Sequence, residues 1–302
     1  MTGRDIRSIA VFLAIAFGLS WLVALPLWLG DGLASPWFVL VSLAMMLTPA
    51  IAALVVVLLV EQPHSKARAL GLSPIRPLGR FFAYLGLGLL VPIVLVLVAL
   101  PVGALLGVYP ADFVNFSAFQ DLIAAQLADA GAPDIAVPIG LLVVVQLVSI
   151  PVGALINLIP ALGEELGWRG WLLPRLMPLG TVPALLISGV IWGLWHAPLI
   201  LLGYNYPDAP GWLGLIMMVG MCILVGAVFG WLRMRSESVW PAALAHGAFN
   251  AAAGSAILFA AAEQHIDTTQ ATILGWSGWI VPLILVAALV AMKRFTPAKP
   301  RG

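Results

Sequence analysis

The chain has 302 residues, of which 62% are hydrophobic and 9% are charged. Soluble domains carry roughly 25% charged residues, so this composition excludes a water-soluble protein and predicts one that is embedded in a lipid bilayer. The 14 basic and 13 acidic residues leave a net charge of +1, which excludes a nucleic-acid partner because nucleic acid calls for clustered basic side chains. The single cysteine, Cys222, excludes both a disulfide framework and a cysteine-based zinc site.

Eight apolar stretches are each long enough to cross the membrane, since ~30 Å of hydrocarbon needs about 20 helical residues. They predict an all-α membrane protein, a polytopic bundle of eight transmembrane helices that forms a single integral-membrane domain over residues 1–302. A short additional helix is expected near 118–130. The predicted spans cover residues 8–29, 37–60, 81–107, 137–162, 182–202, 212–232, 239–262 and 273–292.

The basic residues all fall in alternate segments between the predicted spans. They precede the first span and follow the second, fourth, sixth and eighth, whereas the other loops contain acidic residues and no Lys or Arg. Cytoplasmic loops carry the excess of Lys and Arg, so both termini are expected in the cytoplasm. The same segregation supports eight spans, because moving the count by one span would mix the two kinds of loop.

Two glutamates lie near the cytoplasmic end of the fourth predicted span, where each polar side chain is a candidate for function because its burial is costly. Glu164 and Glu165 are adjacent, so they point about 100° apart on a helix and cannot face one partner. Glu165 and Arg169 are four residues apart and share a face. This spacing predicts that they pair and that Glu164 faces a cavity, where it suits general acid or base chemistry. The alternative is an interfacial glutamate pair that reaches cytoplasmic water.

Two other predicted spans carry the remaining candidates. Trp192 precedes His196 by four residues in the fifth span, and His246 precedes Asn250 by four residues in the seventh. Residues at this spacing share one face of a helix, so each pair can point into the same cavity. We expect Glu164 or His196 to activate a water molecule and His246 with Asn250 to donate hydrogen bonds to an oxyanion. The alternative is that these side chains only pack the helices together.

The three motifs together resemble the CPBP family, the CAAX prenyl protease type II and bacteriocin-processing (Abi) intramembrane endopeptidases. The family pattern combines Glu-Glu-xxx-Arg, aromatic-xxx-His and His-xxx-Asn motifs on successive core helices of an eight-span bundle. Here the motifs read EELGWR from residue 164, WGLWH from residue 192 and HGAFN from residue 246. Trp192 stands where Phe is usual, which keeps an aromatic side chain. The resemblance covers residues 140–262, the expected catalytic core.

The resemblance implies proteolysis inside a bacterial cytoplasmic membrane, with an active site that opens toward the cytoplasm. The substrate it implies is a membrane-associated protein or a lipidated peptide, with membrane lipids as further partners. By this analogy Glu164 and His196 activate the water, His246 and Asn250 stabilise the oxyanion, and Glu165, Arg169 and Trp192 support the site.

A zinc ion is the alternative to direct glutamate chemistry, because Glu164, His196 and His246 could form the His₂Glu ligation of catalytic zinc sites. However, the chain has no HExxH motif, and the ligands would come from three separate helices. Asn250, on the same helix face as His246, is a poor zinc ligand and a good oxyanion donor. We therefore expect no cofactor, with zinc as the less favoured possibility.

Other membrane proteins fit the sequence less well. The segment 275–278 reads GWSG and mimics the GxSG of rhomboid proteases, but it starts the last span and no histidine follows it. A transporter should show internal repeats and helices broken near the midplane, and neither is convincing here. The alternative function is a non-catalytic membrane protein, such as a bacteriocin immunity or scaffold protein or a transporter.

Overall fold

The computed structural model describes residues 3–132 and 137–295 and is 76% helix. Over this part of the chain the only strand-like pairing is an isolated bridge between Ala111 and Ala260, so the prediction of an all-α fold is confirmed. Within these described residues, six helices are long and apolar enough to cross a membrane. The chain is therefore an integral membrane protein.

The helices follow the predicted spans closely. The short helix expected near 118–130 is present as α5 (Ser117–Asp129). The segments corresponding to the fifth and eighth spans hold shorter apolar helices, Thr181–Trp195 and Trp276–Ala291, so the number of eight spans stays a prediction. The other elements are α1 (Gly3–Leu29), η1 (Gly32–Ala34), α2 (Phe38–Val55), η2 (Val56–Glu61), α3 (Lys66–Ala69), α4 (Leu78–Leu105), α6 (Ile139–Glu165), η3 (Leu166–Leu172), α7 (Leu173–Leu176), η4 (Met177–Leu179), α8 (Thr181–Trp195), α9 (Ala197–Ile200), α10 (Gly211–Ser236), α11 (Trp240–Ala253), η5 (Gly254–Phe259), η6 (Trp276–Trp279) and α12 (Ile280–Ala291).

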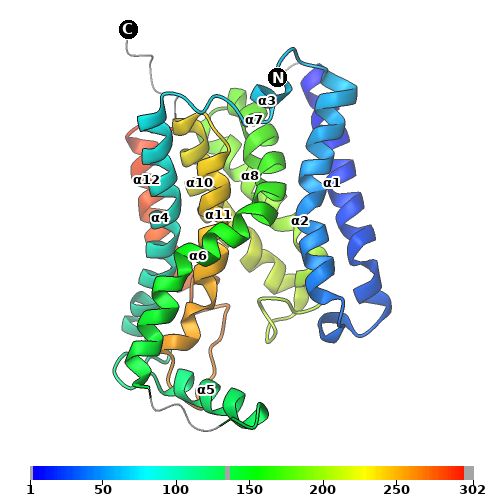
Figure 1. Cartoon of the computed structure of the whole chain (residues 1–302). Helices are drawn as coiled ribbons and strands as arrows, with labels where there is room; N and C mark the ends of the chain where they lie inside the picture. Colours follow the sequence, from blue (N-terminus) through cyan, green and yellow to red (C-terminus); the bar gives the residue numbers. More distant parts are fainter. Residues whose placement is uncertain (1–2, 133–136, 296–302) are drawn as a thin grey trace.

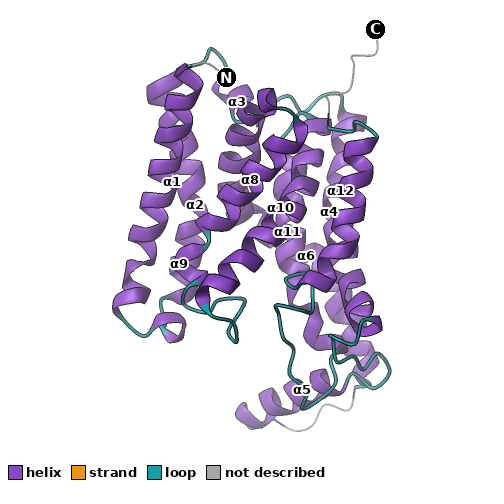
Figure 2. Ribbon diagram, turned by 180° about the vertical axis from the view of Figure 1, so that it is seen from behind, coloured by secondary structure: helices purple, strands orange, loops and turns teal. Residues whose placement is uncertain are grey.

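The two ends of the bundle differ in charge. The start of α1, α3 and α7 lie at one end, whereas α5 lies at the opposite end, below the bundle (Figures 1 and 2). Every Lys and Arg among the described side chains lies in the segments at the first end or in the adjoining helix turns, and we call this the basic end. The opposite or acidic end comprises the segments 30–37, 106–132, 137–138, 201–210 and 260–275. Asp134, Lys299 and Arg301 lie outside the described residues, and so does the side chain of Arg4.

Glycines bring the site-bearing helices close together. A Cβ atom on Gly189 would lie 2.5 Å from the Cα of Ile223, and one on Gly193 would lie 2.5 Å from the Cα of Val219. Small residues four apart allow such close backbone approach between membrane helices. This contact holds α8 against α10 and fixes the place of His196, the residue that follows α8.

The wide π-helical segment η3 continues α6 and covers the bundle interior at the basic end. Gly167 lies directly against Pro49 of α2, where a Cβ atom would approach the Pro49 Cβ to 2.5 Å. Trp168 and Trp171 are buried, and both contact the ring of Phe12 on α1, with ring centroids 5.5 and 4.7 Å apart. Aromatic packing of this kind adds to the stabilisation from burial alone, so η3 is held firmly in place.

Candidate active site

The two glutamates at the end of α6 point toward different partners. Glu165 accepts a hydrogen bond of 2.7 Å from Nη1 of Arg169, one turn further along. Glu164 accepts a bond of 2.8 Å from Nε1 of Trp192 on α8. Both carboxylates are buried, with 2% of Glu164 and none of Glu165 exposed. The predicted pairing of Glu165 with Arg169 is therefore confirmed, and the interfacial alternative for these two glutamates is wrong.

Arg169 is a fully buried cation held between aromatic rings. Its Cζ lies 4.1 Å from the ring centroid of Trp192 and 5.4 Å from that of Phe229. Such contacts with the ring faces are attractive for a cation. Gly226 leaves room for the guanidinium group, because a Cβ there would approach Nη2 to 2.5 Å. The ring of Trp192 contacts the cation and its Nε1 contacts Glu164, whereas its supporting role stays a prediction.

His246 brings α11 into the same network. Its Nδ1 lies 3.0 Å from Oε1 of Glu165, so one carboxylate oxygen has contacts with both His246 and Arg169. A carboxylate only accepts hydrogen bonds, so Nδ1 carries a hydrogen. The sequence spacing gives no sign of this contact, because Glu165 and His246 are 81 positions apart.

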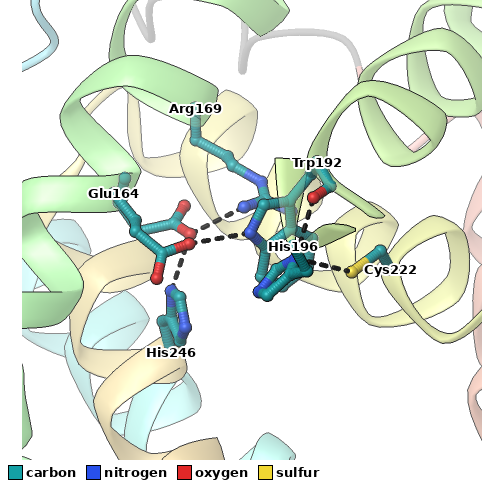
Figure 3. A network of polar contacts seen from close by, with 7 residues as sticks. Glu164, Arg169, Trp192, His196, Cys222 and His246 are labelled. Atoms are coloured by element: carbon teal, nitrogen blue, oxygen red, sulfur yellow. Dashed lines mark hydrogen bonds and ion pairs between the residues drawn. The ribbon is translucent and has the colours of Figure 1, made fainter. Parts of the chain in front are cut away.

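The tautomer of His196 follows from its backbone contact. Its Nδ1 lies 2.8 Å from the carbonyl oxygen of Trp192. A carbonyl only accepts, so Nδ1 donates and Nε2 of the neutral ring keeps a free lone pair. The thiol of Cys222 lies 4.0 Å from the same Nδ1 (Figure 3). His196 is therefore oriented as a proton acceptor.

One cavity of about 360 Å³ joins the predicted catalytic residues. Glu164, His196, His246 and Asn250 all contribute to its wall, from α6, the α8–α9 junction and α11. The wall also includes the polar residue Asn205, which the sequence did not single out. The remainder of the wall is mainly apolar and includes Met45, Trp195, Leu199, Met218, Met221 and Phe249.

The cavity extends toward the acidic end. Its wall includes Tyr204, Asn205 and Leu274, which lie in acidic-end segments. None of the described residues in the wall comes from a segment at the basic end, where η3 is buried. The side of the membrane toward which the cavity opens stays a prediction.

The side chains do not form a ready metal site. Within residues 3–132 and 137–295, no group of three His, Cys, Asp or Glu side chains is arranged to hold a metal ion. One ring nitrogen of each histidine is already engaged, by Glu165 or by a backbone carbonyl. Because the metal content of the protein is a separate question, the expectation of chemistry without zinc stays a prediction.

Comparison with known proteins gives two matches to this region. Residues 146–252 match the family model described as type II CAAX prenyl endopeptidase Rce1-like. The chain is also 30% identical over 84 residues to CAAX prenyl protease 2 of Methanococcus maripaludis, which covers 26% of this chain and 31% of the relative. The matched part thus spans about a third of that relative. The family match includes every candidate residue: Glu164, Glu165, Arg169, Trp192, His196, His246 and Asn250.

Proposed function

Since residues 146–252 belong to the CPBP family of CAAX-type prenyl endopeptidases, we propose that this chain is an intramembrane endopeptidase. It hydrolyses a peptide bond in a membrane-associated protein or peptide, of which a prenylated C terminus is one candidate. The observation that carries the proposal is the convergence of Glu164, His196, His246 and Asn250 on one cavity.

Glu164 acts as the general base on water. Trp192 holds its Oε2 through a hydrogen bond of 2.8 Å, which leaves Oε1 to accept a proton from a water molecule. The lone pair on Nε2 of His196 orients the same water. The water oxygen attacks the carbonyl carbon of the scissile bond, and Glu164 then gives the proton to the leaving amine.

His246 and Asn250 stabilise the oxyanion that forms during the attack. The amide of Asn250 donates through its NH₂ group. The ring of His246 donates through Nε2 when both of its nitrogens carry a hydrogen, and its Nδ1 is held by Oε1 of Glu165 at 3.0 Å. Donors that are fixed before the reaction stabilise developing charge most effectively, and this is the role of Glu165 and Arg169 behind His246.

A non-catalytic scaffold or immunity protein has no evident use for this arrangement. Burial of a carboxylate in an apolar interior is costly, and helix packing alone does not require one. The proposed protease gives the buried Glu164 a function, because water enters the cavity and meets the carboxylate there.

The proposal is tested by Glu164→Gln. We expect cleavage to fall by about 10²–10⁴-fold, because the amide cannot accept the proton. Terminal proteomics of membrane proteins in cells that express either form measures the loss of cleaved fragments. Asp129→Asn, on the exposed side of α5, is the matched control and should leave the fragments unchanged. Undiminished cleavage by a folded Glu164→Gln protein would refute the proposal.

Removal of metal is expected to leave activity intact. The purified protein is treated with a chelator, its zinc content is measured, and cleavage is compared before and after. Stoichiometric zinc that is lost together with activity would replace glutamate chemistry with a metal mechanism, in which Glu164, His196 and His246 are the first residues to consider as ligands.

A further inference from the structure

A second cavity, of about 520 Å³, lies at the basic end of the bundle. Its wall is formed by α3 and the segment that follows it, by α7 and by the end of α10. Both α3 and α7 lie at this end of the bundle (Figure 1). The described residues of this wall include none of the residues that line the catalytic cavity. The second cavity therefore needs an explanation of its own.

The wall contains a buried cation that lacks a partner. Arg233, in the last turn of α10, is 9% exposed, and its Nε has no hydrogen-bond partner within the described part of the chain. Glu237 also belongs to the wall, but its Oε1 pairs with Arg80 at 3.0 Å. By contrast, the buried Arg169 is paired with Glu165 at 2.7 Å. Because a buried charge without a counter-charge is costly, the position of Arg233 favours an anionic ligand.

The guanidinium group of Arg233 is held in place by the backbone beside it. Gly71 lies directly against this group, since a Cβ atom there would lie 2.8 Å from Nε and 2.9 Å from Nη2. The carbonyl oxygen of Gly71 accepts a hydrogen bond of 2.8 Å from the N–H of Val239, which ties this loop to the turn after α10. The guanidinium group is thus positioned before any ligand arrives, and such preorganisation lowers the cost of binding.

The rest of the wall suits a phosphate group. The planar guanidinium group of Arg233 offers N–H donors in a fork that matches phosphate oxygens. Arg68 of α3 is exposed and adds a second cation, and the half-buried Ser73 adds a hydroxyl donor. Pro174 and Met234 supply apolar surface beside these polar groups. Basic pockets between membrane helices bind phospholipid headgroups with this combination of charge and apolar surface.

We infer that this second cavity binds a phosphate group through Arg233 and Arg68. Either an anionic phospholipid headgroup or a small soluble phosphate compound carries such a group. The place of the cavity favours the lipid, because the wall includes the last turn of the membrane helix α10. Arg80 compensates the charge of Glu237, so the wall keeps a net positive charge. The inference does not depend on the proposed protease function.

Thermal unfolding of the full chain in a neutral detergent tests the site, because a ligand that binds the folded state raises the Tm as its concentration rises. The protein is titrated with phosphatidylglycerol, with phosphatidylcholine, and with inorganic phosphate against chloride at equal ionic strength. We expect phosphatidylglycerol to raise the Tm and phosphatidylcholine to raise it much less. A rise with inorganic phosphate alone would support the site and identify a soluble phosphate compound as its ligand. Equal effects of the two lipids, with no effect of inorganic phosphate, would overturn the inference.

Variants at exposed positions separate binding from folding. Arg68→Gln removes a cation of the wall, so the ligand concentration that gives half of the Tm shift should rise about tenfold. Arg76→Gln removes the same charge from an exposed position outside the described wall and should leave that concentration unchanged. Arg233→Lys keeps the charge but loses the planar fork, so it should weaken binding as well. Equal responses of the unchanged protein and Arg68→Gln, or equal losses in Arg68→Gln and Arg76→Gln, would overturn the inference.

Discussion

At the scale of single residues, Glu165 is the centre of the polar network. Its Oε1 contacts Arg169 at 2.7 Å and His246 at 3.0 Å, and all three side chains are buried. Removal of one member of a buried ion pair destabilises a protein by about 3–5 kcal/mol, because the other charge is left without compensation. Glu165 therefore fixes the position of His246 and supports the fold at the same time.

Gly226→Ala tests whether this network needs its close packing. The new Cβ would approach Nη2 of Arg169 to 2.5 Å and Cε3 of Trp192 to 3.3 Å. We expect a loss of stability of about 1–3 kcal/mol, typical of overpacking, together with reduced cleavage because Trp192 also holds Glu164. Thermal unfolding in detergent and a cleavage assay measure the two effects.

The control is Gly86→Ala on α4, where an added Cβ has nothing within 4 Å. A helical Gly→Ala change without a clash should preserve or slightly raise stability. Equal stability and equal cleavage in the two variants would show that the close packing of Gly226 against Arg169 contributes to neither property.

Local contacts of the site were predictable, and distant ones were not. The pairing of Glu165 with Arg169 follows from helical periodicity, because the residues are four apart. The contacts of His246 with Glu165 and of Cys222 with His196 join residues 81 and 26 positions apart. Such contacts depend on how helices pack, and one sequence gives no direct signal for them.

At the scale of helices, two predicted spans have different ends or shapes. The fourth was expected to end at 162, but helical structure continues through η3, α7 and η4 to Leu179, since glycines such as Gly167 let it pack into the bundle. The fifth was expected to be continuous over 182–202, but α8 ends at Trp195 and α9 begins at Ala197. Pro198 lacks a backbone N–H and cannot continue a helix from the preceding turn.

The start of α5 offers an element-scale prediction. Asp112 accepts hydrogen bonds from the backbone N–H groups of Asn115, Ser117 and Val114, and these bonds, chiefly that of Asn115, lower the pKa of Asp112 to about 2. Because the pKa is lowered in the fold, the carboxylate stabilises this turn above about pH 4. That contribution is lost as the pH falls through about 2.

Asp112→Ala should therefore speed hydrogen exchange of the backbone amides at 114–117 at neutral pH and leave cleavage unchanged. Asp121→Ala, on the exposed face of α5, should not affect these amides. Lowering the pH from about 4 to about 2 should reduce the protection of these amides against hydrogen exchange. The reduction should be larger in the protein with Asp112 than in Asp112→Ala. Identical exchange in the two proteins would show that Asp112 does not hold the turn.

At the scale of the whole molecule, composition was sufficient for the fold class. A chain with 9% charged residues must lie in the bilayer, and there a helix satisfies its backbone hydrogen bonds within itself. The convergence of the site residues on one cavity was not accessible in this way, because it depends on how α6, the α8–α9 junction and α11 pack in the assembled bundle.

The number of spans can be tested at its weakest point, the short pair α8 and α9. We expect both to cross the membrane together as one span, because Gly180 lies at the basic end and Asp208 at the acidic end. Reporter fusions that are active on one side only, placed after each of these residues, should report opposite sides. Reports from the same side would reduce the number of spans.

The shared contact of Glu165 also limits how this site can change during evolution. A protein that lost Arg169 or His246 alone would keep the buried carboxylate of Glu165 with too few partners. Its folded state would be destabilised before any new function arose. Substitution of the three residues together by apolar ones avoids that intermediate, and their effects should be strongly non-additive. Descendants that have abandoned proteolysis should therefore have lost the trio as a set, and isolated losses should be rare among them.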